Sequence, residues 1–179
     1  TQALGIDIED IKENFDKATK SYEEGEYNRC MEYLKLVDDT IRLRRERYDR
    51  VINLLAQCER YIDEALNLGS KSPKLEEVKG LKFEAERLLS EHKLQEAEES
   101  CNRALDAIKD VIDTELKRIA LDKITSLPTD IKSLEALGLD TLPLNSLLEE
   151  ARLSFEHNRY RDAYALAKRI EELLEKMRK

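Results

Sequence analysis

The feature of this sequence with the clearest binding chemistry is a group of five arginines within nine residues: Arg42, Arg44, Arg45, Arg47 and Arg50. Guanidinium groups bind carboxylates and phosphates, so one interpretation is a docking site for an acidic partner or for phosphate. The other is pairing along one helix with Asp38, Asp39, Glu46 and Asp49, each pair contributing about 0.2–0.5 kcal/mol. The helical spacing favours the second interpretation.

The residues that most often act as nucleophiles, bases or metal ligands are few and scattered. The three cysteines, Cys30, Cys58 and Cys101, are widely spaced, and they fall at core-facing positions of the repeat described below. Metal sites need clustered thiols or imidazoles. We therefore expect three buried thiols in a reducing compartment, which predicts a cytoplasmic protein. His92 and His157 fall at corresponding turns, so we expect neither to bind a metal or to catalyse a reaction.

Other catalytic motifs are missing from the sequence. It contains no Gly-Lys-Ser/Thr phosphate loop and no His-Glu-x-x-His. Acidic pairs such as Glu149-Glu150 are adjacent, and adjacent helical residues do not face each other. We therefore predict no enzymatic activity, no catalytic residue, no cofactor and no metal.

The charge and hydropathy of the chain limit its partners. Charged residues make up 39% of the sequence and the net charge is −8, whereas general binding to nucleic acid needs a basic face. No window approaches eighteen apolar residues, so membrane insertion is not expected. Protein partners remain the expected class.

A repeat of about 66 residues organises the sequence. Three segments align without gaps at Ala18, Ala85 and Ala151, with offsets of 67 and 66. The same apolar positions recur 4, 9, 12, 16 and 19 residues after each anchor. We therefore expect three repeats, at 1–67, 68–135 and 136–179, each with a short helix, a tight turn and a second helix.

The turn inside each repeat is marked by Gly25, His92 and Asn158, seven residues after the anchor. Glycine and, less often, asparagine or histidine adopt the left-handed conformation that ends many helices. We expect a positive φ at all three positions.

The second helices are predicted to be long. Apolar residues alternate in steps of three and four from Tyr27 to Ala65, interrupted only by Arg44, so one unbroken helix is expected over 27–66. Arg44 should either extend to solvent or pair with a carboxylate of a neighbouring helix. In the second repeat, Pro128 predicts a helix end near Ser126, followed by a short helix near 130–137 that ends at Gly138.

These elements predict an all-α, elongated tandem array in which long helices are shared between overlapping three-helix units. One unit would contain 48–66, 74–90 and 94–108, and the next 112–126, 143–156 and 160–178. The plan resembles that of spectrin-like tandem three-helix bundles, although the Trp of that family is missing. The run Tyr160-x-x-Ala163-x-x-x-Ala167-x-x-Ile170 is also similar to the second helix of tetratricopeptide repeats.

The function expected from this plan is a non-catalytic structural spacer or scaffold. The alternative is an interaction module that binds a helix or peptide in a groove between helices. The motif Ala3-Leu4-Gly5-Ile6-Asp7 recurs as Ala136-Leu137-Gly138-Leu139-Asp140, which predicts that the chain is a fragment of a longer one. We then expect the hairpin 7–43 to expose apolar residues around Phe15, Met31 or Tyr33, or to cover them by self-association at the end of the array.

Overall fold

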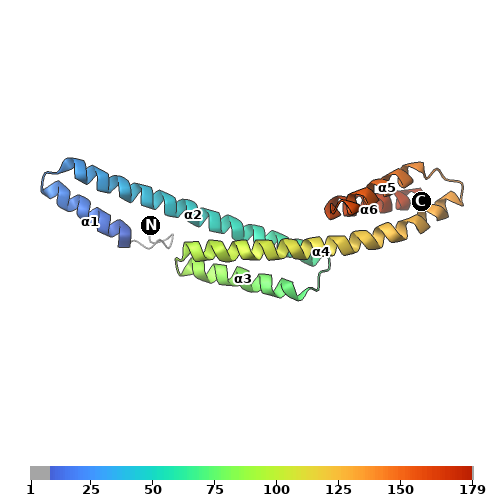
Figure 1. Cartoon of the computed structure of the whole chain (residues 1–179), viewed down its shortest axis with the longest axis horizontal. Helices are drawn as coiled ribbons and strands as arrows, with labels where there is room; N and C mark the ends of the chain where they lie inside the picture. Colours follow the sequence, from blue (N-terminus) through green and yellow to red (C-terminus); the bar gives the residue numbers. More distant parts are fainter. Residues whose placement is uncertain (1–8, 179) are drawn as a thin grey trace. The chain divides into compact units, whose positions relative to one another are not determined.

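The computed structural model describes residues 9–178, and within them the fold is all-α (Figure 1). Six helices follow one another, and no strand occurs among the described residues. Their bounds are α1 Glu9–Glu23, α2 Tyr27–Asn67, α3 Pro73–Ser90, α4 Leu94–Glu135, α5 Leu142–Glu156 and α6 Tyr160–Met177. In this part of the chain no helix is both long and apolar enough to cross a membrane.

The three turns marked by the repeat have the same backbone geometry. Gly25, His92 and Asn158 have φ values of 76°, 65° and 59°, which confirms the predicted left-handed conformation. In each turn this residue donates its N–H to the carbonyl three residues back, and the next residue donates to the carbonyl five residues back. This is the Schellman pattern, which satisfies carbonyls at a helix end. Gly69 and Gly138 close α2 and α4 in the same way.

The long second helix of the first repeat is confirmed. α2 runs without interruption through its 41 residues, and at 1.5 Å per residue its length is about 60 Å. The expected helix starts are also present, because α3 begins at Pro73 and Pro143 lies in the first turn of α5. Proline fits there because an N–H group in the first turn of a helix has no acceptor within that helix, so its loss costs no hydrogen bond.

The predicted end of the next long helix near Ser126 is wrong. α4 continues to Glu135 with Pro128 inside it, so the separate short helix expected near 130–137 does not exist. Leu127, Ile131 and Leu134 lie beyond or beside the proline and are at most 2% exposed. Burying three such side chains contributes about 1.5–3 kcal/mol each. This exceeds the cost of about 3 kcal/mol for an internal proline.

The helices form two compact units, each with its own core. The first comprises the chain up to Asp63 together with Pro73–Ile108. One core cluster of this unit joins Val51 of α2 to residues of α3 and α4, namely Ala85, Leu88, Ala97 and Cys101. The Ser100 hydroxyl also donates to the Leu81 carbonyl at 3.0 Å, which connects α4 to α3.

The second unit comprises Glu64–Ser72 and Lys109–Lys179. Its core cluster takes residues from α4, α5 and α6, and α5 and α6 lie side by side (Figure 1). From Ile108 to Ile124 buried residues of α4 recur every four positions, at 108, 112, 116, 120 and 124, and Val111 is buried beside them. Because each such step turns about 40° around the helix, the apolar stripe moves to a different side of α4. The repeat boundaries at 67 and 135 stay a prediction.

Candidate functional site

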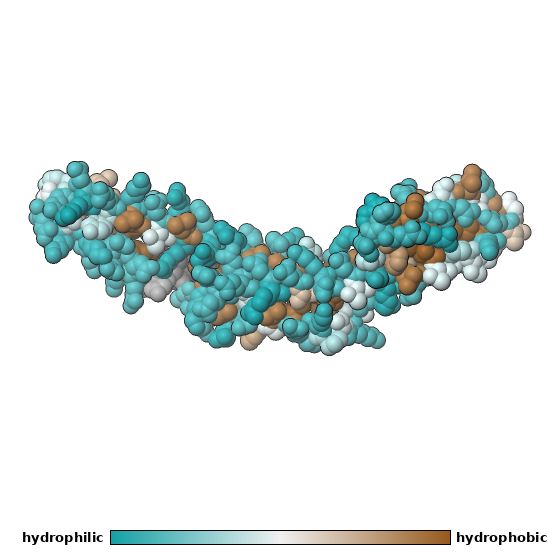
Figure 2. Space-filling model, viewed as in Figure 1, coloured by the Kyte–Doolittle hydropathy of each residue, from teal (hydrophilic) through white to brown (hydrophobic). Residues whose placement is uncertain are grey.

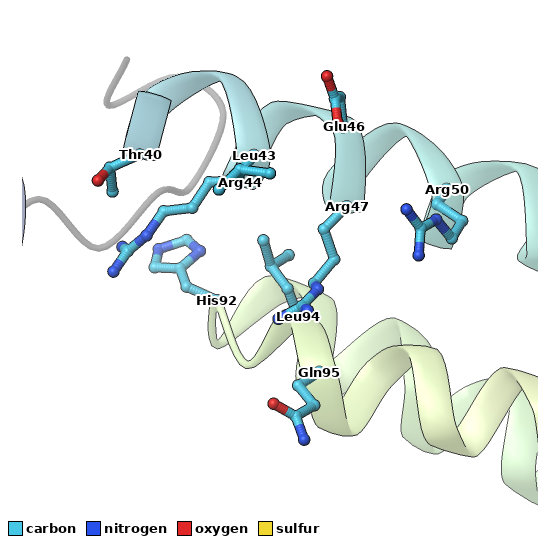
Figure 3. A pocket seen from close by; sticks show the side chains of 9 residues that line it. All are labelled: Thr40, Leu43, Arg44, Glu46, Arg47, Arg50, His92, Leu94 and Gln95. Atoms are coloured by element: carbon cyan, nitrogen blue, oxygen red, sulfur yellow. The ribbon is translucent and has the colours of Figure 1, made fainter. Parts of the chain in front are cut away.

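The arginine group lies in the middle of α2, and three of its members face a cleft. Arg44, Arg47 and Arg50 line this cleft together with residues at the start of α4 (Figure 3). Its volume is about 480 Å³, and its other lining residues are Thr40, Leu43, Glu46, His92, Leu94 and Gln95. Arg42 and Arg45 do not line the cleft.

Carboxylates of this unit already pair with most of these arginines. Arg44 bonds the Asp10 carboxylate of α1, which settles its two predicted fates in favour of pairing with a neighbouring helix. Arg47 and Arg50 both approach Glu98 of α4, at 3.5 Å and 3.1 Å.

The favoured interpretation, pairing along α2, holds for one arginine only. Arg42 bonds Asp39 at 3.0 Å, while within residues 9–178 the other carboxylates named from the spacing do not pair with this group. The reason is geometric. Helical spacing brings residues of one helix within reach, but packing of α2 beside α1 and α4 brings Asp10 and Glu98 equally close.

The electrostatic balance of the cleft follows from these pairs. The Glu98 side chain is 19% exposed, accepts a hydrogen bond from Arg50 and forms an ion pair with Arg47, so two cations share one carboxylate. Pairs of this exposure contribute little energy, about 0.2–1 kcal/mol each. They nevertheless offset the positive charge that an acidic ligand would need. The cleft is therefore a surface with partly balanced charge.

The histidines serve the turns, as their positions predicted. His92 has the positive φ that ends α3, and its ring lies at the edge of the cleft (Figure 3). His157 follows the last residue of α5, and its Nδ1 lies 2.6 Å from the Leu153 carbonyl oxygen. This ring nitrogen of His157 is therefore engaged by a backbone carbonyl at the end of α5.

The cysteines are buried, and two of them meet. The Cys58 thiol donates to the Cys101 carbonyl at 3.7 Å. Burial raises the pKa of the Cys58 thiol. Burial, with smaller contributions from Cys58, Glu86 and Glu98, raises the pKa of the Cys101 thiol to about 12. Because the thiolate is the nucleophile and the metal ligand, this burial works against a nucleophilic or metal-binding role for both thiols. Among the described residues, no three His, Cys, Asp or Glu side chains gather as metal ligands would.

A second surface feature is apolar and lies on α1 and α2. Phe15 is 54% exposed and Met31 is 67% exposed, as expected for the first hairpin. Hydrophobic side chains are visible over this hairpin among the hydrophilic ones that cover most of the surface (Figure 2). Large exposed apolar groups that gather on one element mark interaction surfaces more often than isolated ones do.

Comparison of the chain with protein-family models, with curated proteins and with solved structures found no match. The contacts and exposures described above are therefore the evidence for function. The sequence missed the partners of the arginines, since Asp10 and Glu98 lie 34 and 48 residues from the arginines they bond.

Proposed function

We propose that this chain is a non-catalytic spacer or scaffold segment built from tandem helical repeats. The observation that carries the proposal is that one helix-turn-helix joint recurs at intervals of 67 and 66 residues, with a positive φ and the same pair of hydrogen bonds at Gly25, His92 and Asn158. A joint that is repeated at fixed intervals gives each helix pair the same turn, and tandem copies of one structural unit are the building principle of repeat proteins.

The two long helices support this proposal. The boundary between the compact units falls inside α2, after Asp63, and inside α4, after Ile108. These two crossings are helical, whereas the third, from Ser72 to Pro73, lies in the loop before α3. A continuous helix resists bending better than a linker does. In the finer form of the proposal, the units are overlapping three-helix units in an elongated array, with each long helix shared by two of them.

Small-angle X-ray scattering tests this function. A compact chain of 179 residues has a radius of gyration of about 16 Å. The spacer should give a clearly larger value that does not change with salt. A radius near that of a compact chain would overturn the proposal.

A matched variant separates a stiff spacer from a flexible one. Asp113 and Thr114 are exposed in the interior of α4, and replacing both by glycine weakens the helix by about 1 kcal/mol per residue. The double variant should broaden the distribution of interatomic distances without unfolding the chain. An unchanged distribution would show that α4 does not set the length.

The alternative function, an interaction module, is favoured by the exposed apolar surface of α1 and α2. The arginine cleft favours it less, because the chain's own carboxylates already occupy most of its guanidinium groups. Light scattering at several concentrations would show self-association, if the exposed hairpin is covered by a second copy.

A further inference from the structure

The first hairpin, α1 with the start of α2, corresponds residue by residue to the last hairpin, α5 with α6. The residue number rises by 133 from each residue to its counterpart, as from Ala18 to Ala151. Where the two helices of each hairpin face one another, the counterparts are equally buried: Ala18 with Ala151, Ser21 with Ser154, and Cys30 with Ala163. The aromatic pair at each turn also recurs, with ring centroids 5.7 Å apart for Tyr22–Tyr27 and 5.3 Å for Phe155–Tyr160.

The two hairpins differ in the exposure of the apolar residues that lie farther from the turn. Phe15 is 54% exposed, while its counterpart Leu148 is 3% exposed. Leu34 is 37% exposed, while Ala167 is fully buried. The same holds for the next two positions, where Val37 and Ile41 are half-buried and Ile170 and Leu174 are buried.

A third helix makes this difference. The face of α5 and α6 is covered by the second half of α4, whose residues Ala120, Ile124, Leu127, Ile131 and Leu134 share its core. These five residues are spaced by four, three, four and three. The hairpin of α3 and α4 is likewise packed against Val51, Leu54 and Leu55 of α2. The hairpins α3/α4 and α5/α6 thus each pack against a third, amphipathic helix. In the first hairpin, α1 with the start of α2, the corresponding residues are not covered by another described helix.

The charged residues around this face also correspond. Lys123 of the covering helix bonds Glu171 at 2.6 Å, and Asp130 bonds Arg178 at 2.6 Å. The Lys117 ammonium lies 5.5 Å from the centre of the Tyr160 ring. The counterparts of Glu171, Arg178 and Tyr160 in the first hairpin are Asp38, Arg45 and Tyr27. The charge types are conserved between the two hairpins, an acid followed seven residues later by a base.

Asp38 and Arg45 are free to make the equivalent bonds. Within residues 9–178, neither side chain forms an ion pair or a side-chain hydrogen bond, whereas Glu171 and Arg178 are both paired. The first hairpin therefore presents the apolar face, the acid and the base that a helix like residues 117–135 requires.

We propose that α1 and the first half of α2 form a docking site for an amphipathic helix of a partner polypeptide. The partner helix has apolar residues spaced by four, three, four and three, and a lysine or arginine seven residues before an aspartate or glutamate. A second copy of the chain does not supply this helix, because its own α4 segment is already packed against α5 and α6. The inference goes beyond the spacer function and does not depend on it.

A peptide with the sequence of residues 117–135 is the probe. Pro128 is replaced by alanine in the peptide to favour the helix, and a fluorescein label reports binding to the full chain by anisotropy. Binding will be weakened because a short helix must order as it binds. We expect it to be saturable, with a dissociation constant below about 100 μM. Absence of binding at that concentration would overturn the proposal.

Two variants of the chain locate the binding. Leu34→Glu places a charge on the proposed face and should weaken binding at least tenfold. Phe83→Glu is the matched control, because Phe83 of α3 is 69% exposed and lies outside the hairpin. Circular dichroism verifies that both variants fold. Equal binding by the two variants would overturn the proposal, and it would show that the peptide exchanges with α4 or binds elsewhere.

A charge exchange tests the orientation of the helix. Asp38→Lys should weaken binding of the peptide about threefold to tenfold, and a peptide with Lys123→Glu should restore it. A general loss of structure would not be rescued in this way. Sedimentation velocity tests the other possible occupant of this face, a second copy of the chain. A dimer of the wild-type chain that Leu34→Glu abolishes would assign the face to self-association and overturn the partner helix.

Discussion

Three residues of different chemistry close the same turn. Gly25, His92 and Asn158 adopt the left-handed conformation, which costs most non-glycine residues roughly 1–2 kcal/mol. The hydrogen bonds of the Schellman pattern and the packing of the helices on either side hold the backbone there. The conformation is therefore required by the joint, and the side chain at this position is secondary.

We expect His92→Gly to leave the free energy of unfolding unchanged or to raise it by up to about 1 kcal/mol. Glycine adopts a φ of 65° without strain, and within residues 9–178 the imidazole forms no side-chain hydrogen bond or ion pair. Urea denaturation of the variant and of Asn158→Gly as a parallel case would measure this. A loss of more than 1 kcal/mol in His92→Gly alone would reveal a further role for the ring beside the arginine cleft.

The buried Cys101 thiol makes the stability of the fold depend on pH. Cys101 is fully buried and its pKa is raised to about 12, so the folded chain keeps this thiol protonated far above the ordinary range. In the unfolded chain the same thiol ionises near pH 8.5. Ionisation then favours the unfolded state, and the stabilising effect of the protonated thiol is lost progressively as the pH rises from about 8.5 to 12.

We therefore expect stability to fall as the pH rises through this window, and Cys101→Ala to make the fall shallower. Denaturation midpoints at pH 8 and pH 10.5 would measure the difference. Cys30→Ala tests whether any cysteine substitution has this effect. If Cys101→Ala and the wild-type chain lost stability in parallel, other groups would account for the alkaline limb.

At the scale of the element, α4 shows how tertiary packing overrides a local signal. Pro128 cannot donate a hydrogen bond to the Ile124 carbonyl, yet the helix continues for seven further residues. The preceding turn is held by hydroxyls, since Thr125 bonds the Leu121 carbonyl at 2.7 Å and Ser126 bonds that of Lys123 at 3.1 Å. The residues after Pro128 are buried among α5 and α6.

Replacing Pro128 by alanine should stabilise the chain by about 1–3 kcal/mol. Alanine restores the missing N–H and removes the clash with the preceding turn, while Pro128 itself is only half-buried. Thermal unfolding followed by circular dichroism would measure the gain. The comparison variant is Ile131→Ala, which should lose about 2–5 kcal/mol because Ile131 is 1% exposed. A loss in Pro128→Ala would mean that the ring contributes packing that alanine cannot replace.

At the scale of the whole molecule, stability is distributed over two units with separate cores. Each described core cluster draws on three helices, which are α2, α3 and α4 in the first unit and α4, α5 and α6 in the second. In repeat proteins, the class that we propose for this chain, the stability of each part depends on its own contacts and on its immediate neighbours. Damage to one core should therefore stay local.

Ile170→Ala tests this locality. Ile170 is fully buried in the core of α4, α5 and α6, so the substitution should destabilise that core by about 2–5 kcal/mol. Hydrogen exchange should accelerate in α5 and α6 and remain unchanged in α1 and in α2 up to Tyr48. Uniform acceleration along the chain would show that the whole molecule unfolds as one unit.

The sequence alone determined the all-α class, the three turns and the long α2. These features depend on local physics: the tolerance of Gly25, His92 and Asn158 for positive φ, and the recurrence of apolar residues every three or four positions. The exposure of Phe15 and Met31 agrees with one of the two outcomes expected for the first hairpin, whereas Tyr33 is half-buried. The recurring motif at Ala3–Asp7 lies outside the described residues, so the expectation built on it stays a prediction.

Only the tertiary structure decided the fate of Pro128 and the partners of the arginines. A proline lowers the local preference for helix by a few kcal/mol, and burial of Leu127, Ile131 and Leu134 by distant helices contributes more. Arg44 and Arg50 likewise bond carboxylates 34 and 48 residues away, which helical spacing within α2 cannot predict. Both outcomes depend on contacts between segments far apart in sequence, and these form only when the helices pack.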